Sequence, residues 1–312
     1  MNFNFTFRKI FFLLLALSTL LPFVNAPLAL VMGIVFSLLL GNPFPEKSAK
    51  ISKSLLQLSI IGLGFGLNAV DAFEVSKDGF FITVSTIALV FGLGFLFNKF
   101  FKIEKITALL ISSGTAICGG SAIASVSPIV KAKNEQISIA IGVVFLLNAV
   151  ALLIFPFIGH FFGLSQYQFG LWSAIAIHDT SSVVGAAQAF GAEALEIATT
   201  VKLSRALWII PVTLIISFFV NKSTKVSEVK IPLFIVAFIL AIIIASVFPQ
   251  GKIIYEPVSD FAKQLLVTTL FLIGSEISLV QIKTVGAKSI LYATALWVIV
   301  SIFSLLIIIN NF

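Results

Sequence analysis

The chain has 312 residues, of which 59% are hydrophobic and 11% charged, and its formal net charge is +7. An ordinary soluble domain is about 25% charged, so this composition excludes a soluble globular protein and indicates an integral membrane protein. The basic residues are spread over short loops, where they set membrane topology, and this distribution argues against a nucleic-acid-binding protein. With one cysteine, Cys118, and two histidines, we expect no internal disulfide, no metal site and no cofactor.

Apolar segments follow one another along the whole chain. Because one helical crossing needs about 20 mostly apolar residues, the length allows about ten crossings and leaves no room for a soluble domain. The sequence therefore predicts an all-α polytopic membrane protein with about 9–11 membrane segments, built as a single transmembrane domain, 1–312, with approximate halves 1–160 and 161–312. The predicted segments are 10–22, 27–41, 54–70, 79–98, 106–130, 136–159, 168–191, 197–220, 232–248, 261–280 and 288–310.

The N-terminal segment imitates a cleavable signal, because Arg8 and Lys9 precede an apolar run that ends near the small residue Ala26. Another apolar run follows after a short break. The simpler interpretation is a first helical hairpin that turns within 22–27, and cleavage stays open as the alternative.

Segments 106–130 and 168–191 are interrupted by polar residues and glycines. With the N-terminus inside, the positive-inside rule places the Lys-rich loops 42–53 and 98–105 inside and the acidic loop 71–78 outside. Lys131 and Lys133 also fall inside only if segment 106–130 dips into the membrane and returns. Loop charge therefore favours two re-entrant segments that enter from opposite sides, and two broken helices that cross the membrane are the competing interpretation.

A faint internal repeat supports an inverted arrangement. "LLQLSIIGLGFGLNAVDAF" (55–73) resembles "LLVTTLFLIGSEISLVQI" (265–282), and each interrupted segment precedes a full helix. Inverted repeats of this kind are typical of secondary transporters. The pairs expected to run in opposite directions are 54–70 with 261–280, 79–98 with 288–310, and 136–159 with 197–220.

The first interrupted segment contains a helix break and several hydroxyl groups. Gly119 and Gly120 break the helix, and the half-helix that begins near Ser121 would turn free N–H groups and partial positive charge into the protein, which suits an anion. The alternative is close helix packing through small residues, with hydroxyls bonded to their own carbonyls. The predicted substrate-binding residues are Thr115, Gly119, Gly120, Ser121, Ser182, Lys202 and Arg205.

The second interrupted segment carries ionisable groups at membrane depth, which mark function because they are costly there. We assign ion coupling to His178, Asp179 and Thr180. A hydrolase triad is disfavoured because adjacent residues rarely face one another and no nucleophile elbow accompanies them, so we expect no enzyme. A polar cap on a broken helix is the alternative.

Lys202 and Arg205 lie three residues apart, on one helical face. They are expected to face a cavity, where they would balance Asp179 or bind an anion; snorkelling to the membrane surface is the alternative. On the first interpretation, Arg205→Ala abolishes anion flux and leaves the fold intact. Lesser candidates are Asn68, Asn148 and Glu276.

Three stretches resemble one known family. They are "SGTAICGGSAIASVSPIVKAKNEQISIAIGVVFLLNAVALLIFP" (113–156), "GLWSAIAIHDTSSVVGAA" (170–187) and "VKLSRALWIIP" (201–211). They are similar to the YeiH-type bacterial inner-membrane proteins, whose proposed activity is sulfate export. Similarity to the wider group of sodium/proton antiporters and bile-acid symporters implies inverted repeats whose discontinuous elements cross near the midplane.

These observations together predict a multi-pass protein of the bacterial inner membrane with a cytoplasmic N-terminus. We expect a secondary active transporter that exports a small anion, such as sulfate or a sulfonate, by alternating access coupled to a proton or sodium gradient. A passive anion channel and a transporter of an organic carboxylate remain alternatives. The expected partners are the anion, the coupling ion and the lipid bilayer, and the sequence leaves open whether the chain forms a homodimer.

Overall fold

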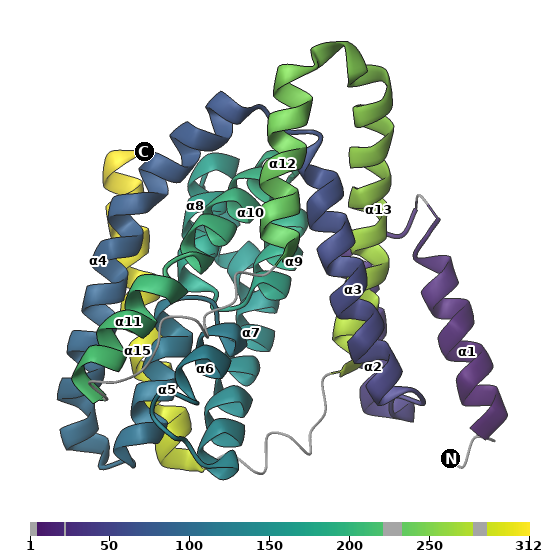
Figure 1. The fold of residues 1–312 in the computed structure, drawn as a ribbon. Coiled ribbons are helices and arrows are strands. Elements are labelled where there is room, and N and C mark those ends of the chain that lie inside the picture. The colour runs from purple at the N-terminus through teal and green to yellow at the C-terminus, as the bar shows by residue number, and fades with distance from the viewer. Residues whose placement is uncertain (1–4, 22, 221–232, 277–285) are drawn as a thin grey trace. The chain divides into compact units, whose positions relative to one another are not determined.

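A computed structural model describes residues 5–21, 23–220, 233–276 and 286–312, and every regular element in these ranges is a helix (Figure 1). The all-α prediction is confirmed. The chain divides into two compact units, unit 1 (Met1–Ala72 and Pro232–Leu279) and unit 2 (Phe73–Ile231 and Val280–Phe312). Each unit therefore takes helices from both halves of the sequence.

Unit 1 begins with the predicted helical hairpin. Arg8, near the start of α1, donates from Nη2 to the carbonyl of Gly41 at the end of α2 (3.0 Å), and the Phe12 and Phe36 rings pack 5.3 Å apart. The hairpin is thus confirmed, although Pro22 of its turn lies outside the described residues. The helices of unit 1 are α1 (Phe5–Ser18), α2 (Ala26–Leu40), α3 (Pro45–Gly64), α12 (Leu233–Val247), the 3-10 turn η2 (Pro249–Gly251) and α13 (Lys252–Glu276).

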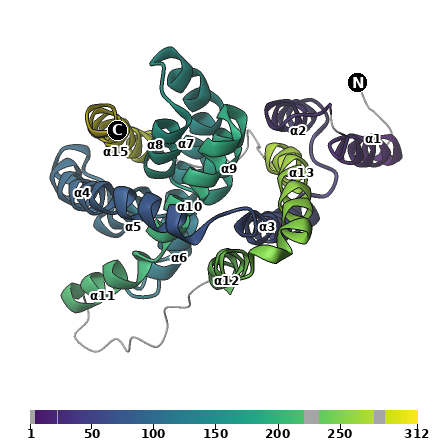
Figure 2. The same cartoon turned by 90° about the horizontal axis from the view of Figure 1, so that it is seen from above.

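Backbone-to-backbone contact joins α13 to its neighbours (Figure 2). A Cβ on Gly33 of α2 would lie 2.1 Å from the Phe271 carbonyl oxygen, so only glycine allows this approach. Helices α3 and α13 run in opposite directions. Ser52, near the start of α3, bonds Glu276 at the end of α13, whereas Gly62, near the end of α3, meets Ala262. This confirms the first predicted inverted pair.

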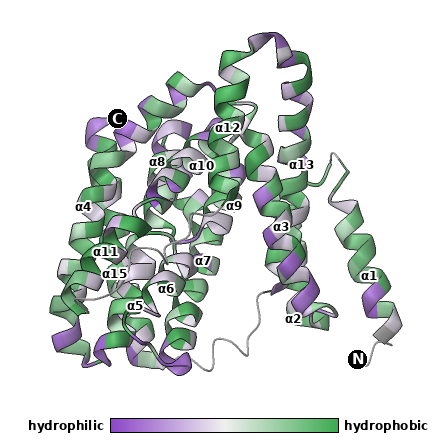
Figure 3. Cartoon of the chain, viewed as in Figure 1, coloured by the Kyte–Doolittle hydropathy of each residue, from purple (hydrophilic) through white to green (hydrophobic). Residues whose placement is uncertain are grey.

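Unit 2 contains the longest helices. Three continuous helices (α4, α7 and α15) and the kinked run 192–220 are long and apolar enough to cross a membrane, and the bent pair α12–α13 of unit 1 could provide a fifth span. Hydrophobic residues predominate along α4, α11 and α15 (Figure 3). The helices are α4 (Ala69–Phe101), α5 (Lys105–Ala116), α6 (Gly120–Val126), α7 (Asn134–Phe161), α8 (Gln166–Ala176), α9 (Thr180–Phe190), α10 (Ala192–Ala206), α11 (Ile209–Val220) and α15 (Ala287–Asn311).

Each of the eleven predicted apolar segments contains helix within the described residues, but several predicted loops are wrong. The stretch 71–78 is helical because α4 has 33 residues, about 50 Å, and extends beyond a hydrocarbon core of about 30 Å. Most of 42–53 is also helical, since Pro45 occupies the first turn of α3, where its missing N–H costs nothing. Residues 192–196 and 252–260, which lie between predicted apolar segments, likewise belong to helices.

Candidate functional site at the meeting point of two hairpins

The first interrupted segment folds back on itself. After α5, the chain turns at 117–119, where Gly119 has a φ of +66°, and α6 returns along α5. A Cβ on Gly114 would lie 3.0 Å from the Ile123 side chain, whereas a continuous helix would separate these residues by about 13 Å. We name α5 and α6 the first hairpin.

The second interrupted segment also folds back. Gln166, at the start of α8, accepts hydrogen bonds at Oε1 from the backbone N–H groups of Glu193 (3.0 Å) and Ala194 (3.4 Å), which follow α9. Phe169 of α8 stacks on Phe190 at the end of α9, with ring centroids 3.9 Å apart. The start of α8 and the end of α9 therefore lie side by side, and we name these two helices the second hairpin.

The two hairpins enter unit 2 from opposite ends of α7, which is about 42 Å long. Gln136, at the start of α7, bonds Glu104, which precedes α5. Gly159, near the other end of α7, lies against Phe169 and Phe190 of the second hairpin. Each segment thus returns to the end of α7 from which it starts, which supports the re-entrant interpretation over broken helices that cross the membrane.

The long helices of unit 2 are also inverted. Tyr167, at the start of α8, bonds Asp78 near the start of α4 and contacts the ring of Phe312 at the end of the chain. Helix α4 therefore begins where α15 ends, so these helices run in opposite directions, as predicted. Helix α7 runs from the first hairpin to the second, and the run 192–220 returns. Segments 136–159 and 197–220 thus run in opposite directions, as predicted.

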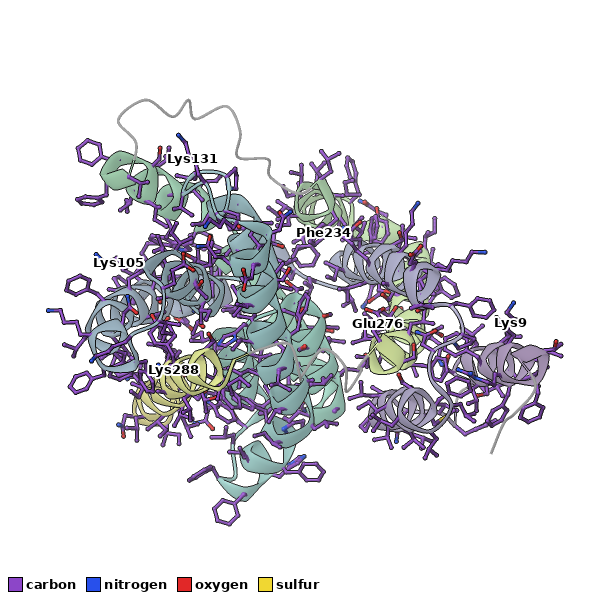
Figure 4. All side chains as sticks on the ribbon, turned by 90° about the horizontal axis from the view of Figure 1, so that it is seen from below. Lys9, Lys105, Lys131, Phe234, Glu276 and Lys288 are labelled. Carbon is purple, nitrogen blue, oxygen red and sulfur yellow. The ribbon has the colours of Figure 1, made fainter. Side chains whose placement is uncertain are left out.

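Charge differs between the two ends of unit 2. At the end where α5 begins, the basic residues outnumber the acidic residues Glu104 and Glu135; three of the lysines are labelled in Figure 4. They are Lys99, Lys102, Lys105, Lys131, Lys133 and Lys288. The end where α8 begins carries Glu74, Asp78, Glu193 and Glu196 against Lys77. The lysines thus gather at one end, as the positive-inside rule requires.

The hairpin tips meet near the middle of α7. A Cβ on Gly119 would lie 3.2 Å from Asp179 Cβ and 3.4 Å from the Val144 side chain. Helix α7 therefore lies beside both tips, with Val144 on the first and Asn148, one turn later, on the second. We name these tips, residues 117–119 and 177–179, the junction.

Lys202 and Arg205 of α10 hold the helix ends that arrive at the junction. Both side chains are fully buried, which excludes snorkelling. Lys202 Nζ donates to the carbonyls of Ile117 (3.3 Å), Ala174 (3.2 Å) and Ile177 (2.6 Å). Three acceptors match the three N–H groups of an ammonium ion, so Lys202 has no donor left for another ligand.

Arg205 bridges both hairpins. Its Nε and Nη2 donate to the Ala116 carbonyl (3.0 and 2.5 Å), and its Nη1 donates to the Ile175 carbonyl (2.8 Å). Trp297 Nε1 donates to the Ala176 carbonyl (3.0 Å). The last carbonyls of α8, which a helix end leaves without N–H partners, are therefore bonded by side chains from α10 and α15.

Two other residues, Asp179 and Asn148, accept hydrogen bonds from the backbone N–H groups at and directly after the second tip. The Asp179 carboxylate accepts from the backbone N–H and the hydroxyl of Ser181, and from the same two groups of Ser182. It therefore caps the N-terminus of α9. Asn148 Oδ1 accepts from the backbone N–H groups of His178 (3.0 Å) and Asp179 (3.4 Å).

The predicted site residues converge here, although exposure differs among them. Thr115, Gly119, His178, Ser182, Lys202 and Arg205 are buried; Gly120, Asp179 and Thr180 are half-buried; Ser121 is exposed. Asn148 ranked only as a lesser candidate, and its signal in the sequence was an amide in an otherwise apolar helix. Trp297 gave no signal, because its role depends on a carbonyl 121 residues away.

The other lesser candidates lie at helix ends. Asn68 Oδ1 accepts from the Val70 N–H at the start of α4, and Glu276, the last residue of α13, bonds Ser52. Neither belongs to the junction.

Comparison with known proteins identifies the relatives of this chain. A UPF0324 membrane protein of Vibrio parahaemolyticus is 50% identical over 292 residues, covering 93% of this chain and 94% of that protein. Another of Geobacter sulfurreducens is 46% identical, covering 96% and 95%. No solved structure matches. The family model described as conserved hypothetical protein 698 matches residues 9–293, and the chain, as its resemblance to the YeiH-type proteins implies, belongs to this family of membrane proteins.

Proposed function

We propose that this protein is a secondary active transporter of a small anion and not an enzyme. The observation that carries the proposal is the junction, where two re-entrant hairpins from opposite ends meet beside the middle of a membrane-spanning helix. Non-helical backbone at membrane depth is tolerated where it is enclosed by protein or lines a cavity, and broken helices of this kind form binding sites in transporters.

Charge at the junction favours an anion. Lys202 and Arg205 contribute two positive charges, and Asp179 contributes one negative charge. Two helix C-termini and two helix N-termini also arrive there, each worth about half a charge, and these partial charges cancel in pairs. The remaining charge is therefore about +1 in a region of low dielectric, where one anion would restore neutrality.

The contacts assign different tasks to the candidate residues. Lys202 and Arg205 supply the field and hold the carbonyl ends, while the half-buried residues directly after the tips, Gly120 and Thr180, are within reach of a solute. Asp179 supplies a carboxylate that a proton or sodium ion can neutralise, and we propose it as the coupling group.

The charge of the two ends supports an orientation in the bacterial inner membrane. We propose that the Lys-rich end of unit 2, where α5 begins, faces the cytoplasm. With α1 to α4 each crossing the membrane, the N-terminus would then be cytoplasmic as well.

Gradient-driven flux in proteoliposomes tests the proposal. The full-length protein is reconstituted, and uptake of labelled sulfate, sulfite, methanesulfonate and a carboxylate is followed under an imposed pH or sodium gradient. We expect one of these anions to accumulate against its own gradient. Flux that only follows the anion's own electrochemical gradient would establish a channel instead, and the absence of flux for all of them would refute anion transport.

A further inference from the structure

Among the buried polar side chains at the junction, those of His178 and Asn148 have nitrogen atoms without hydrogen-bond partners in the described residues. Neither Nδ1 nor Nε2 of His178, which is 1% exposed, has a partner in the described part of the chain, and neither does Nδ2 of Asn148, which is 2% exposed. Leaving a buried polar atom unpaired is costly, so such atoms in a folded protein require an explanation. The two residues are neighbours at the second tip, because Asn148 Oδ1 accepts from the His178 backbone N–H.

The orientation of the Asn148 amide follows from its neighbours. Its Oδ1 faces two backbone N–H groups, and a flipped amide would place N–H groups against N–H groups. The two donors of Nδ2 therefore remain for another ligand. A neutral imidazole adds one more donor and one acceptor.

The charged groups of the junction bond protein atoms, and Arg205 directs three of its five N–H groups to carbonyls. Thr115 Oγ1, two residues before the first tip, is a further buried atom without a partner in the described residues. Lys202 uses all three of its donors on carbonyls, and the Asp179 carboxylate is bonded by Ser181 and Ser182. What remains is a set of hydrogen-bond donors beside a net charge of about +1. This combination suits oxygen atoms that carry a single negative charge.

We infer that Asn148 Nδ2 and the His178 imidazole are the direct ligands of a monovalent oxyanion, and that Lys202 and Arg205 position the tips without touching it. This inference rests on the proposed function and names its substrate class. It moves His178 from ion coupling to substrate recognition. It also disfavours a dianion such as sulfate, because a second negative charge would be left unbalanced in low dielectric.

The substrate class is tested on the wild-type protein with two probes. Methanesulfonate and sulfate both present oxygen atoms on tetrahedral sulfur but differ by one charge. Binding to the full-length protein in detergent is measured by isothermal titration and by Trp fluorescence, because Trp297 bonds Ala176 beside the junction. We expect methanesulfonate to bind at least about tenfold more tightly, a difference of ~1.4 kcal/mol. Equal binding, or tighter binding of sulfate, would overturn the monovalent assignment.

Two variants test the ligands. His178→Phe removes both ring nitrogens without changing charge at neutral imidazole. Asn148→Asp keeps the acceptor for the two backbone N–H groups but removes the donors and adds a negative charge, so unchanged binding in this variant refutes the assignment, whereas weaker binding supports it only together with the result for His178→Phe. Each is expected to weaken methanesulfonate binding at least about tenfold, the value of one hydrogen bond to a charged ligand. The control is Ser59→Ala on α3 of unit 1, whose hydroxyl is equally buried and also without a partner in the described residues.

The outcomes separate this inference from the proposed function. If the wild type transports anions and a folded His178→Phe protein binds methanesulfonate as the wild type does, the ligand assignment is refuted and transport stands. If His178→Phe does not fold, Asn148→Asp decides in the same way. If the wild type transports no anion at all, the proposed function fails first.

Discussion

Unit 1 and unit 2 are both helical and apolar, but the interactions that stabilise each unit internally differ. In unit 1, glycines bring continuous helices into backbone contact, as Gly33 does against Phe271 and Gly274 against Leu30. In unit 2, Gly119 instead lies in a turn where one helix ends and the next begins inside the protein, and buried cations bond the carbonyls at the helix end. Close packing of this kind makes a rigid support, whereas helix ends held by a few side chains make a site that can bind and move.

Removal of Arg205 should produce the largest effect. Arg205→Ala leaves the Ala116 and Ile175 carbonyls without their side-chain donors, and at about 1–3 kcal/mol for each unsatisfied carbonyl we expect a loss of about 2–6 kcal/mol in the free energy of unfolding. The sequence alone predicts a folded variant without flux; the contacts predict a destabilised one. Thermal unfolding in detergent distinguishes these predictions, and an unchanged melting temperature would show that the carbonyl contacts matter little.

Gly33→Ala tests the packing of unit 1. The added Cβ would lie 2.1 Å from the Phe271 carbonyl oxygen, so α2 and α13 must separate, at a cost of about 1–3 kcal/mol. The matched control is Gly92→Ala in α4, where a Cβ meets nothing within 4 Å and alanine should stabilise the helix by up to ~1 kcal/mol. Equal melting temperatures for the two variants would contradict the claim that the close approach of α2 to α13 requires glycine at position 33.

Gly119→Ala tests the contact between the tips. The residue has φ of +66°, so alanine carries a backbone strain of about 1–2 kcal/mol, and its Cβ would also press on Asp179. Gly163→Ala is the control, because it has φ of +64° and open space around the Cβ. We expect the same strain in both variants but reduced anion flux only in Gly119→Ala. Equal flux would mean that the tip contact is unimportant.

Asp179→Asn should have the smallest effect on stability. Asparagine caps a helix N-terminus about as well as aspartate, so the melting temperature should change little, by less than about 0.5 kcal/mol in free energy. The carboxylate is lost, however, and with it the proposed coupling group. Anion exchange down a gradient should persist while gradient-driven accumulation disappears. Retained accumulation would assign coupling to another residue.

Loop charge and glycine placement predicted much of this fold. Lys131 and Lys133 indicated that the first interrupted segment returns to its own side, and the contacts of Gln136 and Gly114 agree. The charged stretch 71–78 misled the prediction because a helix longer than the membrane is thick can carry charges on its protruding turns.

The chemistry of the junction was less predictable. Polar groups in apolar segments identified His178, Asp179 and Arg205 as candidates. Their hydrogen-bond partners could not be predicted. Arg205, for example, bonds the backbone carbonyl of a residue 89 positions away, and because every residue has such a carbonyl, the sequence does not mark this one. Asn148 was undervalued for the same reason, since its partners are backbone N–H groups of another hairpin.

Accessibility of single cysteines from each side of the membrane tests the central claim, that two hairpins enter from opposite faces and meet. The native Cys118 is buried, and exposed positions accept the probes: Lys105→Cys and Lys131→Cys beside the first hairpin, Phe162→Cys and Glu193→Cys beside the second. With a membrane-impermeant maleimide in oriented vesicles, the first pair should react from one face and the second pair from the other. Reaction of Lys105→Cys and Lys131→Cys from opposite faces would contradict the account.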